Sequence, residues 1–390
     1  MAEAPSPYLK LTEIPGRGRS LIVSQPGVKA GEILLQDSPL LLYPSSLPLS
    51  SPPTFCSRCF RTLSSSSSSL ACPSCTTSLF CSPSCLSLAL TSSHSPSLCA
   101  IFAIIRSASL PKLELITPLI FLATAYNLAA SSPPAFRRLL SLEGDPDLAD
   151  ASSAAALHSF FSSLSPPPQT EVGFSLELTA ALLAKDRQNA FGLMEPFDGS
   201  GERAVRAYGI YPKASFFNHD CLPNACRFDY VDRVGDGNTD MVVRAIHDID
   251  EGREVCLSYF PVNWSYKDRQ KRLLEDYGFV CECDRCQVEK NWKENEGDDE
   301  DEGCMEGDDE EDVEFMEEEE DNGGGGDFPH AYFFVNYVCE RENCGGTLAP
   351  LPPSEDGSVS NVMECNVCGQ LKTEVDAGGD SSEDGAMVDE

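Results

Sequence analysis

Basic residues are scarce in this chain relative to acidic ones. Its 390 residues include 28 Lys and Arg against 62 Asp and Glu, which gives a formal net charge of −34. Such a balance repels phosphate backbones, so we expect no direct binding to nucleic acid. Basic proteins or basic substrates are the partners that this charge favours.

The acidic excess is local. Residues 291–327 carry 20 Asp and Glu and one Lys, and the tail 371–390 carries seven acidic residues and one Lys, so the remainder has a charge of only −9. The run at 291–327 is rich in glycine and has too little apolar surface to fold. We predict a disordered, solvated linker there, with a contact to a basic partner as the alternative.

Long apolar runs are missing as well. The first residues, MAEAPSPYLK, lack the apolar core of a secretory signal, and the longest apolar stretch, near 113–130, is interrupted by Glu114, Pro118 and Asn127. We interpret that stretch as a buried helix and expect no membrane segment. Hydrophobic content of 41% and charged content of 23% are typical of a globular protein, here with two or three domains.

Cysteine, by contrast, is abundant. Without a signal peptide, 18 cysteines favour metal binding over disulfides. Seven cysteines and one histidine between 56 and 99 provide eight ligands, enough for two tetrahedral zinc ions, with free or disulfide-bonded cysteines as the alternative. These ligands are Cys56, Cys59, Cys72, Cys75, Cys81, Cys85, His94 and Cys99.

Two further cysteine groups follow. Cys281, Cys283 and Cys286 leave a tetrahedral site one ligand short, and we predict that Cys221 completes it, which requires a long-range contact. A separate finger completed by another cysteine is the rival interpretation. A four-cysteine ribbon is predicted within 328–370 from Cys339, Cys344, Cys365 and Cys368. Cys226, Cys256 and Cys304 remain, and we expect them to be free.

Local patterns indicate a mixture of strands and helices. Two or three strands are expected within 8–44, helices across 100–185, strands at 241–245 and 254–259, and a helix over 265–277. His158 lies in a helix-like run and is expected to be a packing residue.

The stretch 208–224, YGIYPKASFFNHDCLPN, is not explained by helix or strand propensity. It contains an NHxCxPN string formed by Asn218, His219, Cys221, Pro223 and Asn224. The amide and imidazole groups can form hydrogen bonds at fixed places, and the cysteine can bind metal. A turn with a buried cysteine is the simpler interpretation.

NHDCLPN, with GIYPKASFFNH before it and LSYF and YGFVCECDRC after it, resembles the signature of SET-domain protein lysine methyltransferases. The cysteine block at 56–99 makes the chain similar to the SET-and-MYND (SMYD-like) branch, especially plant SMYD-like histone-lysine N-methyltransferases, over about residues 8–290. The resemblance implies an α+β fold of small twisted sheets. The implied segments are SET-N (1–55), a MYND zinc finger (56–99), a helical SET-I insert (100–185), the SET core (186–262), a post-SET zinc segment (263–290), the acidic linker (291–327), the zinc ribbon (328–370) and an acidic tail (371–390).

The resemblance also implies how the finger pairs its ligands. MYND sites interleave, so one zinc ion would take Cys56, Cys59, Cys81 and Cys85. The other would take Cys72, Cys75, His94 and Cys99, although the spacing from His94 to Cys99 is one residue longer than is usual in the family.

The implied cofactor is S-adenosylmethionine (AdoMet), and the implied reaction is methylation of a lysine amine. A narrow aromatic channel suits this reaction, because it keeps the amine neutral, aligned and dry. The catalytic residues would be Tyr259 and Tyr277, and Phe191 would join them in the channel. The cofactor would be held by Gly16, Arg17, Gly18, Asn189, Asn218, His219, Tyr259 and Phe279.

The partners implied are a histone tail or another lysine-containing protein, and peptides docked on the finger. A finger that only buttresses the SET domain is the alternative to peptide docking. We expect a monomer in the nucleus, with the cytoplasm as a second location. Two alternatives stand beside histone methylation: an adaptor with an inactive SET fold, and methylation of a non-histone protein. An intact Asn218, His219 and Tyr259 favour the enzyme.

Overall fold

A computed structural model describes residues 6–24, 26–47, 54–64, 69–107, 113–146, 150–199, 203–291 and 330–373. The predicted acidic linker, apart from its first residue, lies outside the described residues. The acidic tail beyond Thr373 and the remaining cysteine Cys304 lie outside them as well.

The chain opens with four strands, where two or three were predicted. β1 (Leu9–Ile14) and β2 (Gly18–Val23) form an antiparallel hairpin, followed by β3 (Ile33–Asp37) and β4 (Leu41–Pro44). The hairpin turn holds Gly16 and Gly18 at φ of +78° and +69°. Only glycine adopts that region readily, which explains the Gly-x-Gly pattern.

Strands far apart in sequence form the other sheets. β3 joins β11 (Met241–Ala245) and β10 (Ala225–Asp229) in one antiparallel sheet, in the order β10-β11-β3. β4 joins β8 (Val205–Ile210) and β7 (Ala190–Met194), in the order β4-β8-β7. The chain therefore leaves the β structure after β4 and returns to it at β7.

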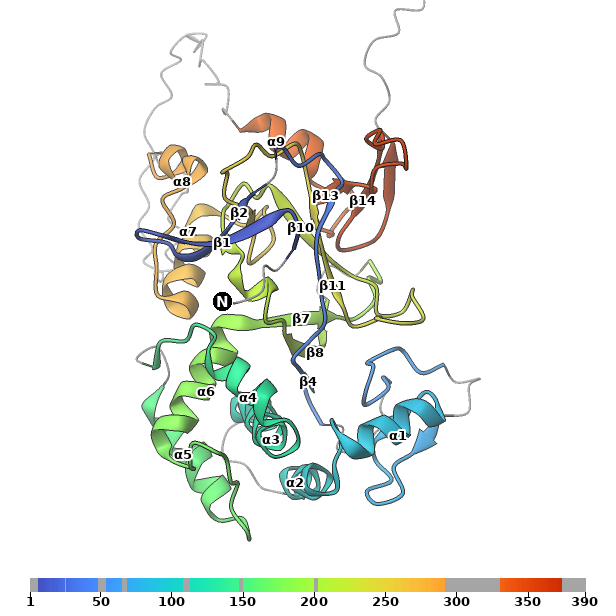
Figure 1. Ribbon diagram of the computed structural model, residues 1–390, viewed down its shortest axis with the longest axis vertical. Helices are drawn as coiled ribbons and strands as arrows, with labels where there is room; N and C mark the ends of the chain where they lie inside the picture. The colour runs from blue at the N-terminus through green and yellow to red at the C-terminus, as the bar shows by residue number, and fades with distance from the viewer. Residues whose placement is uncertain are drawn as a thin grey trace, which may run out of the picture.

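Between β4 and β7 the chain forms a cysteine-rich unit and a helical unit. The cysteine-rich unit holds β5 (Leu70–Ala71), β6 (Leu79–Phe80) and α1 (Pro83–Thr91), and α2 (Pro96–Ser107) leads out of it across the predicted boundary at 99/100. The helical unit continues with η1 (Leu113–Leu115), α3 (Ile116–Ser131), α4 (Pro133–Leu140), α5 (Ala151–Ser162) and α6 (Leu176–Asn189). Figure 1 shows α2–α6 grouped below the strands, with α1 to one side.

The core of the helical unit forms around α3. Its residues 119–123 are fully buried because the helix is apolar on every side and is packed against α2, α4, α6 and β4. This supports the interpretation of 113–130 as a buried helix. His158 stacks on Phe174 with ring centroids 4.5 Å apart and pairs with the Thr179 hydroxyl, as expected of a packing residue.

A short parallel pair brings the NHxCxPN string into the β structure. β9 (Asn218–His219) follows η3 (Ala214–Phe216) and pairs with β12 (Cys256–Leu257), which places Asn218 opposite Cys256. β12 is shorter than the predicted strand at 254–259. After it come α7 (Tyr266–Arg272), a π-helical turn η4 (Leu273–Tyr277) and α8 (Asp284–Glu289). The helix predicted as one element is therefore divided in two.

The C-terminal ribbon follows α9 (Ala331–Tyr337) and consists of β13 (Leu348–Pro350), β14 (Val362–Cys365) and β15 (Leu371–Thr373) in one antiparallel sheet. It lies beside β10 and β11 (Figure 1). Glu364 joins the two, because its carboxylate pairs with Arg244 of β11 at 2.8 Å.

No single helix within the described ranges is long and apolar enough to cross a membrane. One pair, α1 with α2, reaches the required length and composition, but it bends by 92°.

Candidate functional site

Asn218 ties three segments together at the start of the site. Its Nδ2 lies within hydrogen-bonding distance of the Arg17 carbonyl oxygen (3.1 Å) and the Ser20 hydroxyl (2.7 Å). It also lies 2.9 Å from a carboxylate oxygen of Glu254, which pairs with the Arg17 guanidinium at 2.6 Å. The β1–β2 hairpin is therefore held against β9 and the residues before β12.

His219 connects the string to two other parts of the site. Its Nδ1 accepts a hydrogen bond from the backbone N–H of Tyr259 at 3.2 Å, which places the ring proton on Nε2. Nε2 then faces the Cys221 sulfur at 3.2 Å. Burial lowers the pKa of His219 to about 3, so the ring is neutral at physiological pH.

Tyr259 and Tyr277 pack together, with ring centroids 4.7 Å apart. The Tyr259 hydroxyl donates to the Phe217 carbonyl oxygen at 3.0 Å, which fixes its direction. Burial raises the pKa of Tyr259 above its ordinary value, so its hydroxyl remains protonated. Phe279 follows, with its ring 6.5 Å from that of Tyr277 and 38% of its surface exposed.

Phe191 lies on β7 in a separate set of contacts. Its ring meets that of Tyr211 edge-on at 5.8 Å, and the Arg227 guanidinium lies 5.4 Å from its centroid. Among the described residues, no ring contact joins Phe191 to Tyr259 or Tyr277. Phe191 and the tyrosine pair, which were predicted to line one channel, therefore lie in separate sets of ring contacts.

The other predicted cofactor residues are placed unequally. Gly16, Arg17 and Gly18 form the hairpin turn beside Asn218, and a Cβ added to either glycine would meet no atom within 4 Å, so there is open space beside that backbone. Asn189 is buried at the end of α6, where its Nδ2 donates to the carbonyl oxygens of Glu143 and Lys185 at 2.7 and 2.8 Å. Its amide protons are thus used within the helical unit.

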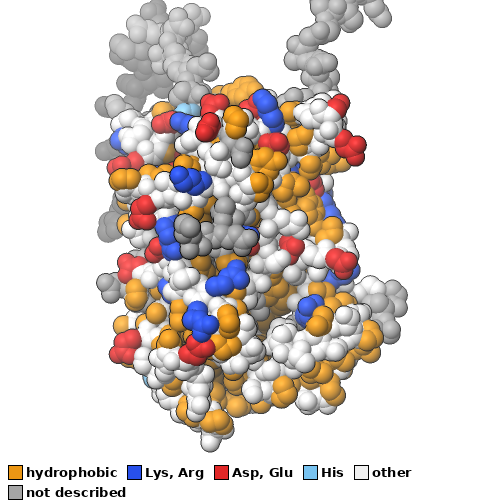
Figure 2. All heavy atoms as spheres, in the orientation of Figure 1, with side chains coloured by type: hydrophobic (Ala, Val, Ile, Leu, Met, Phe, Trp, Pro, Cys, Tyr) orange, Lys and Arg blue, Asp and Glu red, His pale blue; other side chains and the backbone are white. Residues whose placement is uncertain are grey.

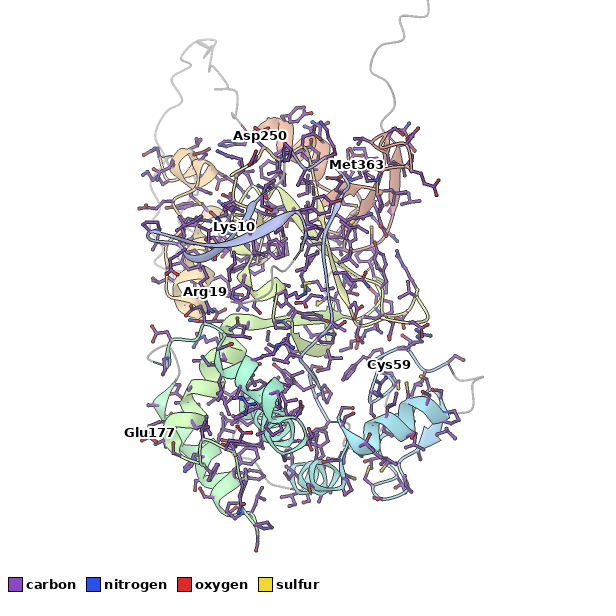
Figure 3. All side chains as sticks on the ribbon, in the orientation of Figure 1. Lys10, Arg19, Cys59, Glu177, Asp250 and Met363 are labelled. Atoms are coloured by element: carbon purple, nitrogen blue, oxygen red, sulfur yellow. The ribbon has the colours of Figure 1, made fainter. Side chains whose placement is uncertain are left out.

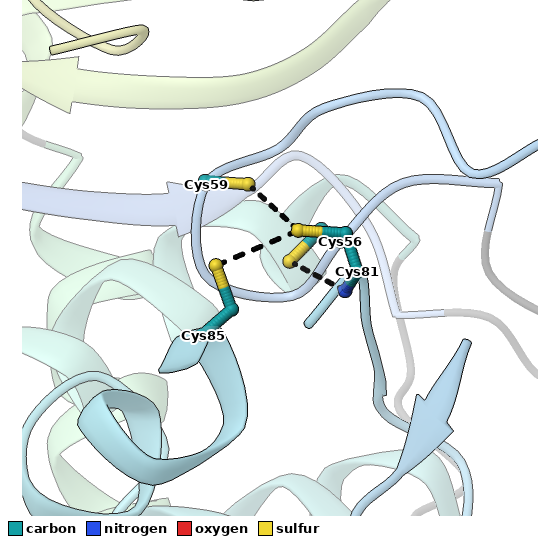
Figure 4. Close-up of side chains that lie close together, drawn as sticks. All are labelled: Cys56, Cys59, Cys81 and Cys85. Atoms are coloured by element: carbon teal, nitrogen blue, oxygen red, sulfur yellow. Dashed lines mark hydrogen bonds between the residues drawn. The ribbon is translucent and has the colours of Figure 1, made fainter. Parts of the chain in front are cut away.

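The cysteine-rich unit contains two donor sets. The first joins Cys56, Cys59, Cys81 and Cys85, with sulfur–sulfur distances of 3.6 Å (Cys59 to Cys81) and 3.5 Å (Cys81 to Cys85), as Figure 4 shows. Tetrahedral zinc with bonds of about 2.3 Å requires sulfurs about 3.8 Å apart, so the spacing fits zinc.

The second donor set contains Cys72, Cys75, His94 and Cys99. Cys72 and Cys99 place their sulfurs 4.0 Å apart, and His94 Nε2 lies 3.6 Å from the Cys75 sulfur. His94 follows α1, and its backbone N–H donates to the carbonyl oxygen of Ala89 within that helix; Cys99 lies in the first turn of α2. His94 therefore lies within its donor set despite its longer spacing to Cys99.

The third donor set shows the long-range contact predicted for Cys221. Its sulfur lies 3.9 Å from that of Cys281 and 3.5 Å from that of Cys286, and Cys283 completes the set. All four sulfurs lie within 4.8 Å of one another. A rival finger completed by another cysteine is therefore not what the geometry favours.

Arg269, a residue that the sequence pattern did not single out, contacts this third set. It is 0% exposed, and its guanidinium lies 3.3 Å from the Cys221 sulfur and 3.9 Å from the Cys286 sulfur. The buried Glu289 pairs with it and with Arg285. Two cations and one anion leave a net positive charge beside these sulfurs, an arrangement that would stabilise thiolates bound to a metal ion.

The fourth donor set lies in the ribbon and contains Cys339, Cys344, Cys365 and Cys368. Cys339 and Cys368 place their sulfurs 3.8 Å apart, and Cys344 and Cys365 place theirs 3.5 Å apart. Gly346 permits this close approach, because a Cβ there would lie 2.4 Å from the Cys365 sulfur. Cys226 and Cys256 are buried outside all four sets, as expected.

Several contributors to the site were given no role from the sequence. Ser20, Glu254 and Asn224 position the string: Asn224 accepts from the Cys256 backbone N–H at 2.8 Å and donates to the Glu254 carbonyl oxygen at 2.8 Å. Only Asn224 had a local signal, because it ends the NHxCxPN string. The other two resemble ordinary strand and surface residues.

Comparison with known proteins gives concordant matches. The SET domain family model matches residues 107–260. Histone-lysine N-methyltransferase ASHR2 of Arabidopsis thaliana is 53% identical over 407 aligned positions, which cover 94% of this chain and 96% of that protein. Histone-lysine N-methyltransferase ATXR4 of the same plant is 32% identical over 27% of this chain and 35% of its own length.

A solved structure is also similar, the SET domain of LSMT bound to lysine and AdoHcy. Its TM-score is 0.31 at 12% identity, with 72% of this chain and 54% of that chain covered.

Proposed function

The chain belongs to the SET-domain family of histone-lysine N-methyltransferases, and from this premise we propose that it transfers a methyl group from AdoMet to a lysine amine of a protein. The observation that carries the proposal is the double contact of His219. This neutral ring joins the backbone of Tyr259 to the sulfur of Cys221, so that one residue links the tyrosine pair to a zinc donor set.

A histone is the proposed substrate, because two relatives are named histone-lysine N-methyltransferases. One of them matches most of this chain and the other matches about a quarter of it. The nucleus is accordingly the proposed location, with the cytoplasm as a second one. A non-histone protein with an accessible lysine would require the same chemistry at the tyrosine pair.

The tyrosine pair would orient and dehydrate the amine. AdoMet supplies a methyl group on a sulfonium, which a neutral lysine amine displaces in line. Tyr259 donates its proton to the Phe217 carbonyl oxygen, so its lone pairs are left for the amine and for methyl C–H contacts. Tyr277 and Phe191 would exclude water, and desolvation lowers the pKa of a lysine amine.

The cofactor would lie beside the hairpin and Phe279. The open space next to Gly16 and Gly18 lets a ligand approach the backbone, and the exposed Phe279 ring offers a face for the adenine or the sulfonium. Asn218 and His219 would hold the cofactor chiefly through backbone groups, because their side chains are already bonded within the protein. For Asn189, whose amide protons are used on backbone carbonyls, we propose an indirect role through the end of α6.

Zinc would have two kinds of role. The interleaved pairs in the cysteine-rich unit have the ligand order of a MYND finger, and a finger this small folds only with its metal. The third set is proposed as a post-SET site that holds Tyr277 and Phe279 near the hairpin. Three of its cysteines follow Phe279 closely in sequence, and the fourth, Cys221, belongs to the string whose Asn218 contacts the hairpin. Peptide docking is proposed as a further role of the finger.

The proposal is tested with radiolabelled AdoMet and a panel of core histones and cell extract. We expect wild type to label a protein, and we expect Tyr259→Phe and His219→Ala to lose the label. Tyr266→Phe is the matched control, because Tyr266 belongs to the same cluster of side chains but its hydroxyl takes no part in the hydrogen bonds of the NHxCxPN string described above. Wild type that binds no AdoMet and labels nothing, with its zinc intact, would favour the adaptor.

A further inference from the structure

Arg227 places a positive charge beside the proposed lysine channel, and methyl transfer itself does not require that charge. It lies on β10, its guanidinium faces the Phe191 ring at 5.4 Å, and its Nη1 donates to the Gly192 carbonyl oxygen at 3.2 Å. In the part of the chain that the structure describes, this is the side chain's one hydrogen bond, and it forms no ion pair. Most of its N–H groups are therefore available to a ligand.

The charge of Arg227 reaches the tyrosine side of the channel as well. Burial raises the pKa of Tyr277, and the guanidinium of Arg272 and then that of Arg227 oppose this rise. Arg227 therefore contacts the Phe191 side of the proposed channel directly and acts on the Tyr277 side through its charge. A substrate lysine bound between those two sides would bring its neighbouring residues close to Arg227.

The surroundings of Tyr277 carry more positive than negative charge. Asp276 pairs with both Arg187 and Arg272, at 3.1 and 2.5 Å. Asp229 follows Arg227 by two residues on β10 and so lies on the same face of that strand, which sets three arginines against two carboxylates. This contrasts with the net charge of −34 of the whole chain. Figure 2 shows several Lys and Arg side chains on the face where the strands meet the helical unit. Arg19, labelled in Figure 3, is one of them.

We propose that Arg227 selects the sequence around the target lysine, by binding a carboxylate side chain next to it. The guanidinium fork matches a carboxylate with two parallel hydrogen bonds, whereas a lysine or arginine at that position would meet a like charge. This inference rests on the proposed function and adds a preference for acidic neighbours.

The acidic balance of the chain does not oppose this preference. The net charge of −34 favours the approach of a basic protein over long range, whereas Arg227 would act on a single side chain at contact distance. A basic protein with one acidic residue beside its target lysine satisfies both.

The test uses the full chain and peptide libraries with a single lysine, flanked on both sides by Glu, Gln or Lys. Variants Arg227→Gln and Arg227→Glu are compared with wild type, and Arg137→Gln on α4 is the control. Arg137 has a comparable charge but pairs with Glu171 on the helical unit. Zinc content and AdoMet binding are measured for every variant, and Arg227→Lys, which keeps the charge without the fork, replaces any variant that fails to fold.

We expect wild type to favour Glu-flanked over Lys-flanked peptides by about tenfold or more in kcat/KM, since one charge pair of modest strength gives that factor. The ratio should fall towards one in Arg227→Gln and invert in Arg227→Glu, chiefly through KM. An unchanged ratio in both variants would overturn the role of Arg227 and leave the proposed function standing. Wild type that binds no AdoMet and methylates no peptide and no protein of the panel, with its zinc intact, would overturn the proposed function itself.

Discussion

Removal of the Glu364 carboxylate should undock the C-terminal ribbon from the strands. Glu364 pairs with Arg244 at 2.8 Å, and their side chains are only 8% and 2% exposed. It also accepts from the Tyr230 hydroxyl at 2.9 Å and from Arg233 at 3.1 Å. Without the carboxylate, Arg244 keeps its contact with the Phe228 ring at 3.7 Å but forms no ion pair with any other described residue.

The expected cost of Glu364→Ala is about 3 kcal/mol, the typical loss when one partner of a buried ion pair is removed. Arg233, whose side chain is 53% exposed, adds little to that figure. The matched control lies in the same ribbon: Glu340 pairs with Lys372 at 2.6 Å, but Glu340 is 73% exposed. Glu340→Ala should therefore cost less than about 0.5 kcal/mol.

Hydrogen exchange of the β14 amides is the suitable assay, because it reports local opening in a chain with several units. A loss of about 3 kcal/mol increases exchange on the order of a hundredfold. Arg244→Met combined with Glu364→Ala should cost less than the sum of the single changes, since no cation is left unpaired. The reasoning is refuted if Glu364→Ala exchanges like Glu340→Ala, or if the double variant shows no coupling.

Three further outcomes are expected. Burial raises the pKa of Asp186, which accepts from the Tyr43 hydroxyl, to about 7. Because the folded state favours the protonated carboxyl, Asp186 makes the free energy of unfolding fall as pH rises from about 4 to 7. In urea titrations at several pH values, Asp186→Asn should reduce the slope of that fall by up to about 1.4 kcal/mol per pH unit. Identical slopes for wild type and variant would contradict the assignment. Metal analysis should find four zinc ions per chain, and three in Cys344→Ser; an unchanged zinc count in that variant would exclude the ribbon site. Tyr259→Phe should lower kcat on the order of a hundredfold with AdoMet affinity retained, and calorimetry showing lost binding instead would move its role to the cofactor.

Local sequence determined the donor sets to a large extent. Two cysteines with two or three residues between them can bind one ion without help from the rest of the fold. Cys56 and Cys59 could therefore be recognised as ligands from their spacing alone. Cys221 could be predicted because three cysteines need a fourth ligand. The apolar α3 was recognisable for a similar reason, since burial on every side requires an unbroken local pattern.

The tertiary structure alone decided the partners of the charged residues. Arg269 lies in KDRQKR, which resembles a solvated helix face, yet it contacts two thiols and is fully buried. Glu364 and Arg227 likewise have no local signal, because their contacts lie 120 and 35 residues away in sequence. A charged side chain pairs with the groups that the folded chain brings within about 4 Å, and the local spacing of residues in the sequence does not reveal which groups those are.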